Sequence, residues 1–180
     1  RSMYGVYAVY DNHDIEEPIL AGITLRGDGK KQSSPEMDAF LTSANIRLLR
    51  DEAVLLGGEV YLYGRPDAQR PGRGVEVRKT PAELVEGLDT DKPILVLDHQ
   101  PRELEELAEA GVDVDLCGHT HDGQMFPGNL TVRLFWENAC GYLRVGSMHS
   151  IVTSGVGLFG PNMRVATRAE ICPITIRFAE

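Results

Sequence analysis

Three histidines of this sequence lie directly after runs that are typical of β-strands. His99 follows the apolar run at 93–97, and His119 and His121 follow the run at 112–117. Imidazole is the commonest side-chain ligand for transition metals near neutral pH. A lone histidine is more often structural, but three of them after strand ends favour a metal site. We expect Gly118 to free the backbone so that His119 and His121 both turn inward.

A second polar cluster, Asn12-His13-Asp14, follows the β-prone run at 5–10. By itself it is typical of a polar turn, because Asn and Asp favour turns. As a functional cluster, it gives each residue a task. Asn12 offers a neutral oxygen ligand, His13 offers a proton donor for a leaving group, and Asp14 offers a carboxylate that would orient the imidazole.

The elements that would position these clusters alternate between strands and helices. Ser34-Pro35 predicts a helix start, and Thr80-Pro81 with Glu83 predicts a second one with a capping box. A third helix is expected at 103–110. Strands are expected at 5–10, 46–49, 52–56, 59–63, 93–97 and 112–117, and further β-prone runs lie at 132–136, 142–145, 150–153 and 171–178.

In open α/β sheets, ligands bind beyond the carboxyl ends of the strands. If the strands that end before Asn12, His99 and His119 are neighbours, their polar clusters converge on one site. The fold class predicted from this order of elements is α/β, with an antiparallel part that closes the sheet near the C-terminus.

The composition fits one folded domain and excludes some partners. The 180 residues are 42% hydrophobic and 25% charged, and we expect 4–180 to form a single domain. Arg1-Ser2-Met3 resembles an expression scar. The net charge of -9 argues against nonspecific binding to nucleic acid or anionic lipid. No apolar run approaches the roughly 18 residues of a membrane span.

The three cysteines, Cys117, Cys140 and Cys172, show no pairing pattern. We expect buried free thiols rather than a disulfide framework.

Taken in order, these motifs resemble the signature of the calcineurin-like metallophosphoesterases. The resemblance is carried by Asn12-His13-Asp14, by His99 before Pro101, and by Gly118-His119-Thr120-His121. The continuation Asp122-Gly123-Gln124 is similar to the small bacterial phosphohydrolase branch, whose usual form is GHTHGGQ. The resemblance spans roughly residues 5–176.

The resemblance implies a fold of two packed β-sheets flanked by helices. It also implies hydrolysis of a small phosphomonoester or phosphodiester by two divalent metal ions (Mn, Fe, Zn or similar), which activate a hydroxide that attacks phosphorus. Carried over by position, Asn12, His99 and His119 would bind one metal and His121 the other. His13 would stabilise or protonate the leaving oxygen, supported by the last residue of its motif, Asp14.

Two positions depart from the family pattern by a carboxylate. Asp11 stands where the family usually has Gly before Asn-His-Asp, and Asp122 replaces the first Gly of GHTHGGQ. Each could tune the choice of metal or repel an anionic substrate, and the sequence leaves both open.

Two family motifs, Asp-x-His and Gly-Asp-x-x-Asp, are expected upstream of Asn12 and do not occur there. We therefore expect an N-terminally truncated domain that is weak or inactive as an enzyme, from a cytoplasmic or membrane-associated parent. Without those strands, the strand at Val6 to Tyr10 would be an exposed apolar edge with no Lys or Pro. Such an edge favours a homodimer.

Two other readings compete with this one. The first is a noncatalytic metal-binding or interaction module on the same scaffold. The second is a structural zinc site of Cys117, His119 and His121, since thiolate and imidazole suit zinc.

Overall fold

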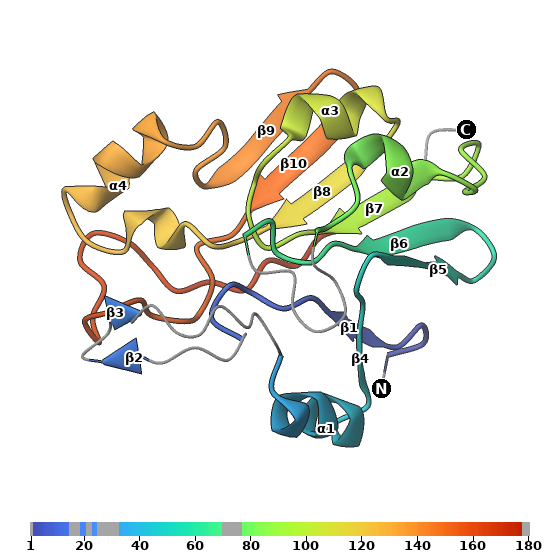
Figure 1. Ribbon diagram of the computed structural model, residues 1–180. Helices are drawn as coiled ribbons and strands as arrows, with labels where there is room; N and C mark the ends of the chain where they lie inside the picture. The colour runs from blue at the N-terminus through green and yellow to red at the C-terminus, as the bar shows by residue number, and fades with distance from the viewer. Residues whose placement is uncertain (1, 15–18, 21–22, 25–32, 70–76, 178–180) are drawn as a thin grey trace.

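The computed structural model describes residues 2–14, 19–20, 23–24, 33–69 and 77–177. Its main feature is a six-stranded sheet in the order β5-β6-β7-β8-β10-β9 (Figure 1). The strands are β5 (Glu52–Leu56), β6 (Val60–Gly64), β7 (Ile94–Leu97), β8 (Val114–Cys117), β9 (Gly141–Val145) and β10 (Met148–Val152). The four central strands are parallel, and the edge strands β5 and β9 are antiparallel to their neighbours. The carboxyl ends of β7 and β8 therefore meet at one edge.

A second, smaller sheet pairs β1 (Val6–Ala8) with β4 (Ile46–Leu48) in parallel. A separate hairpin joins β2 (Ile19–Leu20) and β3 (Ile23–Thr24). An apolar cluster of Leu49, Leu62, Leu95 and Val114 lies between the two sheets, with Tyr7 of β1 packed against it. Gly64 ends β6 at a close approach, because a Cβ there would lie 2.2 Å from the Leu49 Cβ.

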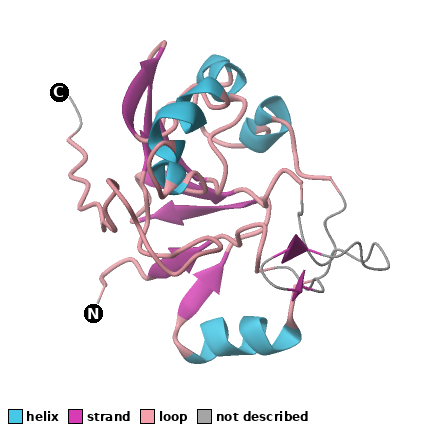
Figure 2. Ribbon diagram, turned by 90° about the vertical axis from the view of Figure 1, so that its left-hand side faces the viewer, coloured by secondary structure: helices cyan, strands magenta, loops and turns pink. Residues whose placement is uncertain are grey.

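Helices cover the outer layers, so the predicted fold class of two packed sheets flanked by helices is confirmed. The short helices α2 (Pro81–Val85) and α3 (Leu104–Glu109) cover one face of the six-stranded sheet, opposite to the face that packs against β1 and β4. Their buried core there comprises Tyr63, Leu84, Ile94, Val96, Leu104, Leu107, Val112 and Met148. The helix α1 (Pro35–Ser43) lies at the opposite end, beyond β4 (Figure 2).

The predicted helix starts are confirmed by their hydrogen bonds. The Ser34 hydroxyl accepts from the Met37 N–H, and Thr80 and Glu83 form a reciprocal capping box. These contacts satisfy backbone donors that the first turn of a helix leaves unpaired.

Two of the expected β-runs are wrong. Residues 132–136 begin in a helical segment, where α4 (Gly128–Thr131) continues into the 3-10 turn η2 (Val132–Leu134). Residues 171–177 form no strand, and Phe178 lies outside the described residues. A β-prone run becomes a strand only where a neighbour accepts it, because strand preference depends on context. The antiparallel closure by β9 and β10 is confirmed.

The cysteines are all free, and they differ in exposure. Cys117 is buried as expected, Cys140 is partly buried, and Cys172 is exposed, so the expectation is wrong for the last. Within the part of the chain that the structure describes, no helix has the length and apolarity to cross a bilayer.

Candidate metal centre

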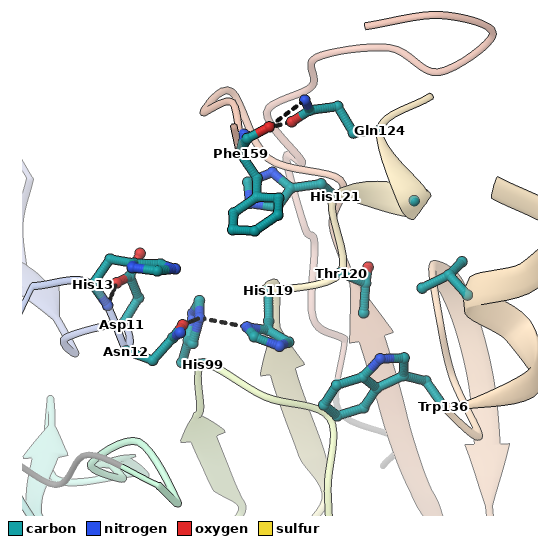
Figure 3. A pocket seen from close by; sticks show the side chains of 12 residues that line it. Asp11, Asn12, His13, His99, His119, Thr120, His121, Gln124, Trp136 and Phe159 are labelled. Atoms are coloured by element: carbon teal, nitrogen blue, oxygen red, sulfur yellow. Dashed lines mark hydrogen bonds between the residues drawn. The ribbon is translucent and has the colours of Figure 1, made fainter. Parts of the chain in front are cut away.

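A pocket of about 560 Å³ opens at the carboxyl ends of β7 and β8 (Figure 3). Five of the six predicted site residues line it: Asn12, His13, His99, His119 and His121. The sixth, Asp14, lies one residue beyond the lining. The other lining residues are Asp11, Thr120, Gly123, Gln124, Val132, Trp136 and Phe159. Segments far apart in sequence, at 11–13, 99, 119–124, 132–136 and 159, thus meet at one place.

Three donor atoms converge within this pocket. Asn12 Oδ1 and His119 Nδ1 each lie 2.9 Å from His99 Nε2. The His99 and His119 rings meet edge to face, with centroids 4.8 Å apart. In Figure 3 these side chains lie at the centre of the pocket, between His13 and Trp136.

This arrangement is poorly explained as hydrogen bonding alone. A neutral ring nitrogen carries either one proton or one lone pair, and an amide oxygen carries only lone pairs. One proton at His99 Nε2 cannot give both 2.9 Å contacts an ordinary linear hydrogen bond. Two ligands about 2.1 Å from a metal lie about 3.0 Å apart at octahedral angles and about 3.4 Å apart at tetrahedral angles, so the 2.9 Å contacts resemble the octahedral case. The donors of Asn12, His99 and His119 therefore fit a shared cation.

The protonation of the histidines suits the same role. Burial lowers the pKa of His99, and burial together with the neighbouring His99 lowers the pKa of His119 to about 4. Burial also lowers the pKa of His121, and the positive charge of Arg164 adds to this shift. All three rings are therefore neutral near pH 7, and a neutral imidazole has the lone pair that a metal requires.

A buried ionic network holds the backbone beside His99. Asp98, the preceding residue, is fully buried and accepts from Arg65 Nη1 at 3.0 Å and from Arg78 Nη1 at 2.8 Å. Both arginines also donate to Glu103 Oε2, at 2.8 and 2.6 Å. Glu103 adopts a left-handed φ of 57° at the start of α3, and these ion pairs hold it there.

A second chain of contacts leads from a buried carboxylate to His119. Gln100 Nε2 donates to Asp67 Oδ2 at 2.6 Å, and Arg102 Nε donates to Gln100 Oε1 at 2.7 Å. The Arg102 guanidinium lies 4.6 Å from the centre of the Trp136 ring. That ring in turn meets His119 edge to face, at 5.1 Å between centroids. The indole therefore fixes one side of this ligand.

A tight left-handed turn carries His119 and His121, the two candidate ligands that follow β8. His119, His121 and Asp122 have φ values of 68°, 51° and 52°. The turn thus places both imidazoles in the pocket as expected, but the unusual backbone belongs to the histidines themselves rather than to Gly118. Gly123 is required next, because a Cβ there would lie 2.2 Å from the Gly128 carbonyl carbon.

His121 is held by a side chain from near the C-terminus. Arg164 Nη1 donates to the His121 carbonyl at 3.1 Å, and Arg164 Nη2 lies 3.5 Å from His121 Nδ1. The same guanidinium donates to the carbonyls of Ser154 and Gly157, at 2.6 and 2.8 Å. Arg164 thereby ties the loop at 154–164 to the His121 turn.

The Asp11 to Asp14 segment is organised by its own carboxylates. Asp11 Oδ1 accepts from the backbone N–H groups of His13 and Asp14, and Asp14 Oδ2 accepts from the Asp11 N–H at 2.9 Å. Burial raises the pKa of Asp14. The Asp11 carboxylate, which departs from the family pattern, thus shapes the turn that presents Asn12 and His13. The orienting role of Asp14 toward the imidazole stays a prediction.

Neither Asp122 nor Cys117 lines the pocket of the proposed metal. Asp122 Oδ1 lies 3.8 Å from Arg133 Nη2, and Asp122 does not line the pocket. The Cys117 thiol donates to Asp115 at 3.1 Å, and burial raises its pKa well above the usual value. The zinc reading of Cys117, His119 and His121 is therefore wrong.

Among the described residues, no group of three or more His, Cys, Asp or Glu side chains stands ready to hold a metal. The Asn12 set has only two such residues and an amide. Sequence reasoning missed the pocket walls formed by Trp136 and Phe159. It also gave no role to Arg164, which contacts His121.

Several curated proteins resemble this chain in sequence. An "Uncharacterized metallophosphoesterase" of Aquifex aeolicus is 34% identical over 140 residues, which cover 77% of this chain and 53% of that protein. One of Helicobacter pylori is 31% identical over 179 residues, covering 95% of the chain and 42% of that protein. A "Transmembrane protein with metallophosphoesterase domain" of Danio rerio is 40% identical over 115 residues, which cover 61% of this chain and 25% of that protein.

The chain thus spans about half, or less, of the length of these curated relatives. No family model matches the chain, and no solved structure matches it. Several relatives that are 27% to 40% identical are named metallophosphoesterases or proteins with that domain, and each matches most of this chain. By its motifs, its sheets and these relatives, the chain belongs to the metallophosphoesterase family.

Proposed function

We propose that this chain forms part of a calcineurin-like hydrolase of phosphomonoesters or phosphodiesters. The supporting observation is the convergence of Asn12 Oδ1, His99 Nε2 and His119 Nδ1 at 2.9 Å contacts in one pocket. The names of its relatives agree with a phosphoesterase. Activity would need the family's upstream motifs beside this pocket, so the chain itself would be a weak or inactive enzyme.

In the proposal, Asn12, His99 and His119 hold one divalent metal ion (Mn, Fe, Zn or similar), and His121 belongs to a second. When bound, these ions would supply Lewis acidity that draws negative charge from the phosphate oxygens. The chain's own residues position the ester. The neutral imidazoles of His99, His119 and His121 keep their lone pairs for the ions, and Trp136 and Phe159 form an apolar wall on one side.

His13 is the proposed proton donor for the leaving oxygen. It lines the pocket, is exposed to solvent, and its ring centroid lies 6.0 Å from that of Phe159. An exposed imidazole can regain its proton from water after each turnover. Asp14, which bonds to the Asp11 N–H within the same turn, would keep this segment in place.

A noncatalytic metal-binding or interaction module is the second candidate. It is favoured by the small number of His, Cys, Asp and Glu ligands that the described residues bring together. One weakly held ion without a partner ion would bind an anion but would aim no nucleophile.

Hydrolysis of 4-nitrophenyl phosphate and its bis ester with added Mn²⁺ separates the two candidates. We expect little turnover by this chain, and clear turnover by a chain that also carries the upstream motifs. In that longer chain His13→Ala should lower turnover by roughly 10²- to 10⁴-fold. His149→Ala is the matched control, because His149 bonds to Tyr142 outside the pocket.

Robust turnover by the present chain that His119→Ala abolishes would contradict the need for the upstream ligands. No turnover of either ester by the longer chain would favour the noncatalytic module.

A further inference from the structure

One wall of the metal pocket is apolar. Val132, Trp136 and Phe159 line the same pocket as the histidine ligands. Its volume of about 560 Å³ lies within the range of roughly 300–1,000 Å³ that holds drug-sized ligands. A phosphate held by the metal ligands would make no use of this apolar wall, so the wall bears on the rest of the substrate.

The apolar wall continues out of the pocket along two neighbouring segments. Their exposed side chains, here called the apolar rim, are Phe126, Leu130, Leu134, Phe135, Val156, Leu158, Phe159, Met163 and Val165. Seven of these nine are more than half exposed. Clustered exposed apolar side chains mark binding sites, and Phe159 belongs both to this rim and to the pocket lining.

Hydrogen bonds hold the two halves of the rim side by side. The Phe126 N–H donates to the Val165 carbonyl at 3.0 Å, and Met125 and Val165 form an isolated parallel bridge. Gln124 Nε2 donates to the Phe159 carbonyl at 2.6 Å. Gln124 is itself buried and lines the pocket, so the rim is anchored to the pocket wall.

We propose that the substrate of this site is a phosphoester whose leaving group is a long apolar chain. The phosphate would lie at Asn12, His99 and His119, and the chain would run over Phe159 onto the apolar rim. A sugar or another small polar group would leave this surface in water. The continuity of the rim with the metal pocket selects one ligand that has both a phosphate and an apolar chain. This inference deepens the proposed function and rests on it.

Binding of alkylphosphonates tests the proposal, because their carbon–phosphorus bond survives this hydrolysis. Trp136 is the only tryptophan of the chain and lines the pocket, so its fluorescence reports occupancy. Methyl-, butyl-, hexyl- and octylphosphonate would be titrated with Zn²⁺ and again without metal. Each buried methylene should tighten binding roughly fourfold, and three should tighten it roughly 60-fold.

Phe159→Ser should remove most of this dependence on chain length. Phe40→Ser is the matched control, because Phe40 on α1 is 60% exposed and Phe159 is 56% exposed. Both changes are at the surface, and circular dichroism would confirm that both variants fold. Co-sedimentation of the protein with vesicles that contain phosphatidic acid would show whether the apolar group of the substrate belongs to a membrane lipid or to a soluble ester.

Equal dissociation constants for all chain lengths, with and without metal, would overturn the proposal. Equal behaviour of Phe159→Ser and Phe40→Ser would overturn it as well. Failure of the proposed function has a different result, in which Zn²⁺ does not tighten methylphosphonate binding while the dependence on chain length remains.

Discussion

The two halves of the pocket are positioned by different kinds of structure. His99 and His119 follow adjacent parallel strands, and a buried ionic network and the indole of Trp136 hold them. His121 and Phe159 lie on irregular chain that is tied together mainly by hydrogen bonds to carbonyls. In the first half, which contains His99 and His119, the facing ring nitrogens lie 2.9 Å apart. The proposed metal position at His99 and His119 therefore depends mainly on the sheet, whereas the proposed position at His121 depends on loops.

The largest expected effect is on the network beneath His99. Asp98→Asn removes the negative charge that pairs with the buried guanidinium groups of Arg65 and Arg78. Breaking a buried pair costs about 3–5 kcal/mol, so the free energy of unfolding should fall by that amount. Urea denaturation would measure it. Glu52→Gln is the control, because its pair with Arg47 is half exposed and should contribute less than about 1 kcal/mol.

A loss as small as that of the control would show that the buried network does not support the first half. Weaker metal binding by a folded Asp98→Asn protein would link the network to His99.

The next effect is a dependence of stability on pH. Burial, with the nearby Asp98, raises the pKa of Asp115 to about 7. Between the unfolded value near 4 and this folded value, the folded chain holds a proton that the unfolded chain has released. Stability therefore falls as pH rises through this window, by up to about 1.4 kcal/mol for each pH unit, and is lowest above pH 7.

Asp115→Asn removes this titration, so its stability should fall less between pH 5 and 8 than that of the parent chain. Denaturation curves at several pH values would measure the difference. Parallel profiles would show that the interior behind the first half is more polar than the burial of Asp115 implies.

A smaller effect is expected in the second half of the pocket. Arg164→Ala removes the donors that join His121 to the carbonyls of Ser154 and Gly157. We expect a loss of roughly 1–3 kcal/mol. We also expect faster hydrogen exchange at 154–164, with metal affinity unchanged. Arg168→Ala is the control at an exposed arginine. Metal affinity that falls with Arg164→Ala would break the distinction between the halves.

The smallest effect concerns the strand that leads to Asn12. We propose that β1, which has three residues and pairs only with β4 in the sheet described, associates with a second copy of the chain. Val6 is 50% exposed, so Val6→Lys should leave the fold intact and shift sedimentation toward the monomer. A parent chain that sediments as a monomer at micromolar concentration would contradict the dimer.

The sequence predicted the parts of the site that depend on strand ends. His99 and His119 follow regular buried strands, and their convergence follows from parallel pairing, which the order of elements indicated. The capping signals at Ser34 and Thr80 were equally local and correct. Such features need only the nearby sequence and the rules of α/β sheets.

The rest depends on contacts between distant segments. Phe159 reaches the pocket because the Gln124 side chain forms hydrogen bonds with its backbone, 35 positions along the chain. No pattern in either segment predicts this contact. The run at 132–136 was misread because its apolar residues form a pocket wall and a rim rather than a strand face. The left-handed φ values of His119 and His121 could not be predicted from the sequence either, since non-glycine residues rarely adopt them.

Calorimetric titration of the metal-free chain with Zn²⁺ would measure how many ions the pocket holds and how tightly. We expect at most one weakly held ion per chain, bound by Asn12, His99 and His119. Its affinity should be lost in His119→Ala and retained in His121→Ala. Two tightly held ions per chain, or equal losses in the two variants, would contradict the account.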